Sequence, residues 1–119
     1  EFIQRTGCNS FAPSIGNAHG IYATAPRLNF GVLDQLKERG RVPLVLHGGS
    51  GLSVRHLRRA IAGGVLKVNF ASELRSAFTE GLADGGGLSA ADPRPVLGHA
   101  RERVMKIALK RLRDLGWRG

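Results

Sequence analysis

Residues Val42–Gly51 read VPLVLHGGSG, an apolar run that passes directly into a glycine-rich turn. A strand that is buried on both faces of a parallel sheet requires such a run, and Pro43 is tolerated near its start. The glycines let the backbone approach a ligand closely, and Ser53 is a suitable N-cap for a helix through Ala62. The stretch therefore predicts a buried strand, a turn open to a ligand and a helix, in that order.

The same order of strand, loop and helix occurs before and after this stretch. The preceding unit has a strand at Ser10–Ile15, a polar loop at Gly16–Pro26 and a helix at about Asn29–Arg39. The following unit has a strand at Val65–Phe70 and a helix at about Ser72–Leu82. Repeated strand-to-helix units are typical of a parallel sheet with helical crossovers, so the expected fold class is α/β.

The segments outside these units also carry helix signals. Glu1–Arg5 is predicted to be the last turn of a helix that stops at Gly7, and this beginning in mid-pattern indicates a fragment. Ser72 is the predicted N-cap of the third helix. Residues 84–92 contain three successive glycines and are predicted to be a flexible linker.

A final helix is predicted at about Pro93–Leu115, with Asp92 as its cap. Its apolar residues recur at helical spacing and predict one buried face. They are Leu97, Ala100, Val104, Ile107, Ala108, Leu112 and Leu115.

The charge of the chain is strongly basic. Its 119 residues include 18 Lys+Arg and 9 Asp+Glu, a formal net charge of +9, and the excess concentrates in Arg55–Arg59 and Arg94–Arg118. Such a charge favours a nucleic-acid-binding module, but aromatic residues make up only 6% of the chain and no reading motif is present. A solvated helix face opposite an apolar stripe is the simpler interpretation.

Other classes of protein are excluded by composition. No run approaches the roughly 18 to 20 apolar residues of a membrane-spanning helix. The sequence also leads us to expect no export leader. The single cysteine, Cys8, excludes an internal disulfide and a multi-thiolate metal site. We therefore expect a cytoplasmic protein with no membrane partner.

Polar residues with binding chemistry follow the predicted strands. His19 follows the first strand, His47 ends the second and Asn69 ends the third, and the carboxyl ends of parallel strands meet at one edge. Imidazole is a common zinc ligand, but a catalytic zinc usually has three protein ligands. His56 and His99 lie within helices and are interpreted as surface or packing residues.

Two turns are suited to a phosphate group. The turn His47–Gly51 exposes backbone N–H groups just before a helix, and the segment Asn69–Ser72 places a second helix N-terminus with an amide and a hydroxyl. The residues alone therefore indicate a phosphate-binding half-pocket that could also bind a metal ion.

Several segments, taken in order, resemble the class II, zinc-dependent ketose-bisphosphate aldolases, a family that includes fructose-bisphosphate and tagatose-bisphosphate aldolases. The chain departs from the family pattern at Asn9, where Asp is frequent, and at Ser72, where Thr is usual. The segments that carry the resemblance are Thr6–Ser10, Ile15–Tyr22, Leu28–Phe30, Val42–Gly51, Lys67–Leu74 and Asp92–Arg94.

The resemblance implies that residues 1–119 form the C-terminal part of a single (β/α)8 TIM barrel, about three βα units plus a C-terminal helix. It implies that His19 and His47 are two of the zinc ligands. The third histidine and the aspartate that donates the proton would lie upstream, so no catalytic acid is expected in this chain. A monovalent cation beside the phosphate is a further implied cofactor.

The implied reaction is the zinc-dependent, reversible aldol cleavage of fructose or tagatose 1,6-bisphosphate to dihydroxyacetone phosphate and glyceraldehyde 3-phosphate, a step of carbohydrate metabolism such as glycolysis. The whole protein would be a homodimer or homotetramer, and the fragment alone would be inactive. The alternatives are an inactive aldolase-like subunit and the nucleic-acid-binding module. The residues expected at the phosphate end of the substrate are Gly20, Gly48, Gly49, Ser50, Asn69, Phe70, Ala71 and Ser72.

Overall fold

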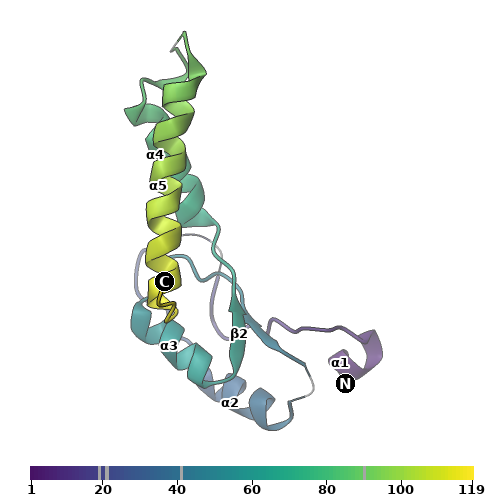
Figure 1. The fold of residues 1–119 in the computed structure, drawn as a ribbon. Helices are drawn as coiled ribbons and strands as arrows, with labels where there is room; N and C mark the ends of the chain where they lie inside the picture. The colour runs from purple at the N-terminus through teal and green to yellow at the C-terminus, as the bar shows by residue number, and fades with distance from the viewer. Residues whose placement is uncertain (19, 21, 41, 90) are drawn as a thin grey trace. The chain divides into compact units, whose positions relative to one another are not determined.

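The computed structural model describes residues 1–18, 20, 22–40, 42–89 and 91–119. These residues form a mixed α/β structure with two compact units, Glu1–Phe70 and Ala71–Gly119, which are drawn in sequence colours in Figure 1. The first unit holds the sheet and three helices, and the second is helical.

The sheet of the first unit pairs β1 (Leu44–Leu46) with β2 (Val65–Val68) in parallel, and Leu46 lies opposite Val68. All three residues of β1 are buried, which confirms the prediction of a strand covered on both faces. On the other side of β1, Phe11 forms a single parallel bridge to Leu44. β1 therefore lies between Phe11 of the first predicted strand and β2.

The prediction of a full strand at Ser10–Ile15 was wrong, because only Phe11 pairs with β1. The Phe11 N–H donates to the Pro43 carbonyl at 3.0 Å, and the Phe11 carbonyl accepts from the Val45 N–H at 2.9 Å. In a parallel ladder the next N–H facing β1 would belong to residue 13. Pro13 has no N–H, so the ladder stops there.

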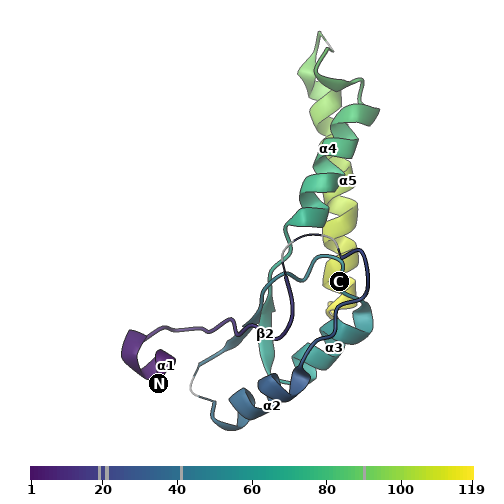
Figure 2. The same cartoon turned by 180° about the vertical axis from the view of Figure 1, so that it is seen from behind.

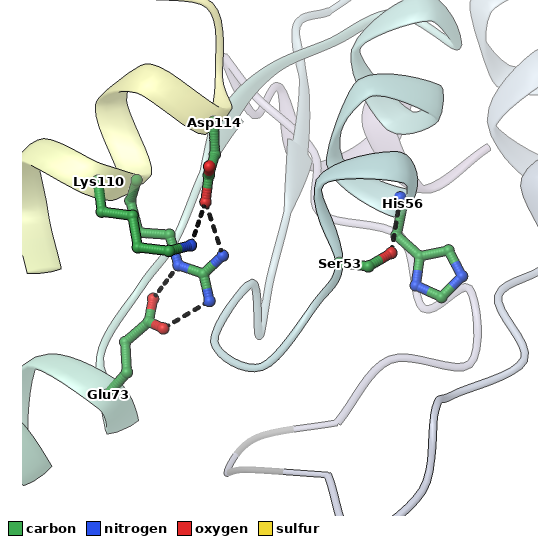
Figure 3. A network of polar contacts seen from close by, with 6 residues as sticks. Ser53, His56, Glu73, Lys110 and Asp114 are labelled. Atoms are coloured by element: carbon green, nitrogen blue, oxygen red, sulfur yellow. Dashed lines mark hydrogen bonds and ion pairs between the residues drawn. The ribbon is translucent and has the colours of Figure 1, made fainter.

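The helices of the first unit begin and end close to their predicted bounds. They are α1 (Phe2–Thr6), α2 (Phe30–Glu38) and α3 (Val54–Ala62). The αL conformation of Gly7 ends α1, and the Ser53 side chain caps α3 by accepting from the His56 N–H at 3.2 Å (Figure 3).

An ion pair joins α2 to α3. The Arg59 guanidinium contacts the Asp34 carboxylate, with Nη1 3.1 Å from Oδ1, and lies 5.4 Å from the centre of the Phe30 ring. The hydrogen bond from Arg59 lowers the pKa of Asp34. The apolar core of this unit consists of Ile15, Leu33, Leu44, Val45, Leu46, Leu52, Leu57, Ala60 and Val65.

The second unit is a helical hairpin of α4 (Ser72–Asp84) and α5 (Pro93–Asp114), joined through a 3-10 turn, η1 (Gly87–Ser89). The two helices run side by side in opposite directions, as Figures 1 and 2 show from both sides. The Asp92 carboxylate accepts from the Arg94 N–H at 3.0 Å, so the predicted cap of α5 is confirmed. The flexibility of residues 84–92 stays a prediction.

Ser72 is the first residue of α4 and Ala71 is its N-cap, so the prediction that Ser72 caps this helix was wrong. Ala71 has φ −141° and ψ −58°, and no side chain bonds to the helix N-terminus from that position. Ser72 is therefore already part of the helix, whereas an N-cap residue has non-helical φ and ψ angles.

The apolar face predicted for α5 is buried in large part, since Ala100 is buried and Val104, Ile107, Ala108 and Leu115 are half-buried. Val96 and Ala100 are buried, whereas Leu97 and Leu112 are exposed. The hairpin packs backbone against backbone at Gly81, where an added Cβ would lie 2.8 Å from the Ala100 nitrogen. This close approach puts Val96 and Ala100 in the interface and leaves Leu97, about 100° further around the helix, outside it.

The sequence predicts that the arginines of the C-terminal stretch are only solvated. Two of them instead form ion pairs with carboxylates of α4. Arg103 on α5 pairs with Glu80 and Asp84 of α4, and Arg111 pairs with Glu73. The α4–α5 interface is therefore held by charged contacts as well as by apolar packing. In the described part of the chain, no helix has the length and apolar character needed to cross a membrane.

We predict opposite effects from alanine at two helical glycines of the hairpin. Gly81→Ala should lower the free energy of unfolding by about 1–3 kcal/mol, because the methyl group would overlap the α5 backbone. Gly98→Ala should raise it by about 0.5–1 kcal/mol, because nothing lies within 4 Å and alanine favours helix. Urea unfolding of the complete protein measures both, and a Gly81→Ala variant as stable as Gly98→Ala would contradict this packing.

Candidate functional site

The turn that follows β1 is locked to the end of β2 by Gly49. The Gly49 N–H donates to the Asn69 carbonyl at 2.8 Å. A Cβ added to Gly49 would lie 2.6 Å from Val68 Cγ1 and 3.0 Å from Phe70 Cε1, so no larger residue fits without displacing β2. Two of the predicted phosphate segments, the glycine turn and the end of the third predicted strand, are thus brought into direct contact.

The rest of the turn has the backbone shape that its glycines allow. Gly48 has φ 64° and Gly51 has φ 78°, both in the left-handed region. Ser50 lies between them and is only 2% exposed. The turn then leads through Leu52 to the Ser53 cap, so it presents the N-terminus of α3 next to the end of β1.

His47 comes directly after β1 and its side chain is exposed. Together with Gly48 it lines a cavity of about 260 Å³ in the first unit. The other residues that line this cavity are Ala12, Pro13, Ser14, Asn17 and Ala18. The structure therefore places His47 beside the loop that follows the first predicted strand, as expected from parallel strand ends.

Asn17 joins that loop to the turn after β1. Its Oδ1 accepts from the Ile15 N–H at 3.0 Å, and its Nδ2 donates to the His47 carbonyl. Both polar atoms of the side chain are used, so the backbone of His47 is fixed from the loop. No chemical motif in the sequence assigns Asn17 to the site; the available signal is its position two residues after the apolar Ile15 in a polar loop.

Tyr22 was also missed. Its hydroxyl oxygen accepts from the Ala18 N–H at 3.0 Å and lies 2.9 Å and 3.3 Å from the carbonyl oxygens of Ala18 and Gly48, to either of which it can donate. No spacing rule in the sequence points to this contact. Tyr22 supports the fold of the loop against the glycine turn.

The first-strand loop holds two of the predicted site residues. His19 lies outside the described residues, so its predicted role as a metal ligand stays a prediction. Gly20 has φ 108°, and a Cβ added there would meet no atom within 4 Å. The positive φ angle, and not a shortage of space, therefore favours glycine at position 20.

The segment after β2 divides between the two units. The Asn69 N–H donates to the Leu46 carbonyl at 2.9 Å and its carbonyl accepts from Gly49, so its side-chain amide is the group that it can offer to a ligand. Phe70 ends the first unit, Ala71 opens the second, and Ser72 lines a surface hollow on α4. The N–H groups of the first turn of α4 have no acceptor within the helix, a property of every helix start.

The donor atoms suit zinc as part of a larger ligand set. Imidazole nitrogen is a regular zinc ligand, and His47 offers one from an exposed position at a strand end. Among the described residues, no three His, Cys, Asp or Glu side chains gather closely enough to hold a metal ion. His47 therefore fits as one ligand, and a zinc site here would need further protein ligands.

Comparison with known proteins assigns the chain to a family. The family described as "Fructose-bisphosphate aldolase class-II" matches residues 1–119. The structure of the YdjI aldolase from Escherichia coli K12 is similar with a TM-score of 0.81 and 33% sequence identity, over 97% of this chain and 41% of that one. A fructose-bisphosphate aldolase from Campylobacter jejuni shares the fold, with a TM-score of 0.69 and 24% identity over 89% of this chain and 38% of its own.

The chain thus spans about two fifths of the length of these solved relatives. The family match covers every residue of this chain. His47 lies beside the loop after the first predicted strand, and the glycine turn is bonded to the end of β2. This chain belongs to the class II fructose-bisphosphate aldolase family.

Proposed function

We propose that this chain is the C-terminal portion of a zinc-dependent aldolase that cleaves a ketose 1,6-bisphosphate, fructose or tagatose, to dihydroxyacetone phosphate and glyceraldehyde 3-phosphate. The observation that carries the proposal is the exposed His47 at the end of β1, followed at once by a turn that Gly49 locks to β2. Family membership supports this substrate class.

The open side of β2 supports the proposal that the chain is part of a (β/α)8 barrel. Within the described residues β2 pairs only with β1, and Leu66 of β2 is 78% exposed. Every strand of a closed barrel has two neighbours. The remaining strands, the third zinc histidine and the acid that donates the proton would come from the rest of the complete protein.

The residues of this chain would divide between metal and phosphate. His19 and His47 would hold zinc, which when bound supplies a Lewis acid that polarises the ketone of the substrate. Backbone N–H groups would bind the phosphate, because the glycines of the turn expose them to a ligand. The residues proposed for the phosphate are Gly20, Gly48, Gly49, Ser50, Asn69, Phe70, Ala71 and Ser72.

The nucleic-acid alternative loses part of its support. Arg59, Arg103 and Arg111 of the two basic stretches are paired with carboxylates, so the positive charge is partly neutralised within each unit. A homo-oligomeric state and a monovalent cation near the phosphate remain predictions from the resemblance. The inactive-subunit alternative is an outcome of the next experiment.

His47→Ala in the complete protein should abolish zinc binding and lower the cleavage rate of both bisphosphates by more than about a hundredfold. Loss of a residue that only supports a metal ligand costs up to about a hundredfold, and loss of the ligand itself should cost more. His99→Ala is the matched control, since His99 is an exposed residue of α5. Zinc content by atomic absorption and a coupled cleavage assay measure the result. Unchanged zinc and cleavage in His47→Ala would overturn the proposal, and zinc binding without any cleavage by the unmodified protein would favour the inactive subunit.

Asn17→Ala should weaken zinc binding about 10- to 100-fold, because the His47 backbone loses its hydrogen bond from the loop. Asn29→Ala is the control, since the exposed Asn29 side chain makes no cap hydrogen bond to α2. Competition with a chelator gives the zinc affinity of each variant, and circular dichroism verifies that each is folded. A folded Asn17→Ala variant with unchanged zinc affinity would show that this contact does not position His47.

A further inference from the structure

Four charged side chains meet at the first turn of α4. The Arg111 guanidinium of α5 donates from Nε to Glu73 Oε1 at 2.7 Å and from Nη2 to Oε2 at 2.6 Å. Asp114 accepts from Arg111 at 3.1 Å and from Lys110 at 2.9 Å. In Figure 3, dashed lines run from Glu73 and Asp114 to this one guanidinium group.

The Arg111–Glu73 contact is the most sheltered ion pair between α4 and α5. The side chains of Arg111 and Glu73 are 12% and 16% exposed, whereas those of Arg103 and Glu80 are 42% and 60% exposed. The two-bond geometry fixes both the position and the plane of the guanidinium. The hydrogen bond that Arg111 donates to Glu73 raises the pKa of Arg111, so the guanidinium stays charged.

Glu73 lies where its negative charge would affect the binding of a phosphate. It is the second residue of α4 and follows Ser72, which the proposed function assigns to the substrate phosphate. A carboxylate in the first turn of a helix is stabilised by the helix dipole. The same carboxylate would repel a phosphate dianion at that turn unless a cation neutralised it.

We propose that Arg111 is a positioning residue for phosphate binding: by pairing with Glu73 it neutralises the negative charge at the first turn of α4, where the substrate phosphate would bind. This inference rests on the proposed function. Glu73, Asp114, Arg111 and Lys110 together carry no net charge, so the cluster adds neither attraction nor repulsion of its own. Removing Arg111 alone would leave an excess of negative charge beside Ser72.

The test compares Arg111→Met, Glu73→Gln and the double variant in the complete protein. The probe is inorganic phosphate, as a competitive inhibitor of bisphosphate cleavage. Arg111→Met should raise the inhibition constant and KM by roughly three- to tenfold, the size expected for one carboxylate acting on a phosphate through partly solvated surroundings, with kcat within about twofold. Glu73→Gln should leave the inhibition constant unchanged or lower it, and the double variant should return it to within about twofold of the original.

A purely structural role makes a different prediction, because the double variant would bind phosphate as weakly as Arg111→Met. Arg103→Met is the matched control: it removes ion pairs to Glu80 and Asp84 in the same hairpin but away from the first turn of α4. It should lower the Tm without changing the phosphate inhibition constant. An equal change in Arg103→Met, or no recovery in the double variant, would overturn the inference.

The outcomes separate this inference from the proposed function. If the unmodified complete protein neither cleaves the bisphosphates nor responds to phosphate, both are wrong. If phosphate inhibits it but Arg111→Met has the same inhibition constant, only the inference is wrong. If Arg111→Met does not fold, Glu73→Gln decides, since a raised inhibition constant in that variant would contradict charge neutralisation.

Discussion

The contact of Gly49 with the end of β2 is the constraint on which the candidate site depends. Its N–H bonds to the Asn69 carbonyl, and its missing side chain makes room for Val68 and Phe70. This contact fixes the glycine turn relative to two strand ends. His47, two residues earlier, is held from the opposite direction by Asn17, so the exposed imidazole projects from a backbone fixed on both sides.

The helical hairpin follows a different physical rule. Gly81 and Gly85 let α4 approach α5 so closely that a Cβ at either position would overlap the backbone of the opposite helix. At such a short distance the interface has little room for large apolar residues, and arginine–carboxylate pairs flank the contact. The basic character of α5 is therefore partly a means of holding α4, and Glu73 at the start of α4 is one of the groups held.

The sequence predicted the order of the elements because each signal was local. The apolar run at Leu44–Leu46, the Ser53 and Asp92 caps and the αL position of Gly7 all act within a few residues, and all were confirmed. The strand at Ser10–Ile15 was overpredicted because the consequence of Pro13 depends on which edge of the strand faces β1. The contacts of Asn17 and Tyr22 and the close approach of the two helices at Gly81 could not be predicted, because each depends on a partner distant in sequence.

If this chain supplies metal and phosphate ligands to an aldolase, removal of the metal from the complete protein should stop the reaction. The complete protein would be assayed for cleavage of fructose 1,6-bisphosphate and tagatose 1,6-bisphosphate before EDTA treatment, after it, and after zinc is returned. We expect cleavage of at least one substrate that EDTA abolishes and zinc restores. Cleavage that survives complete metal removal, or no cleavage of either substrate with zinc present, would contradict it.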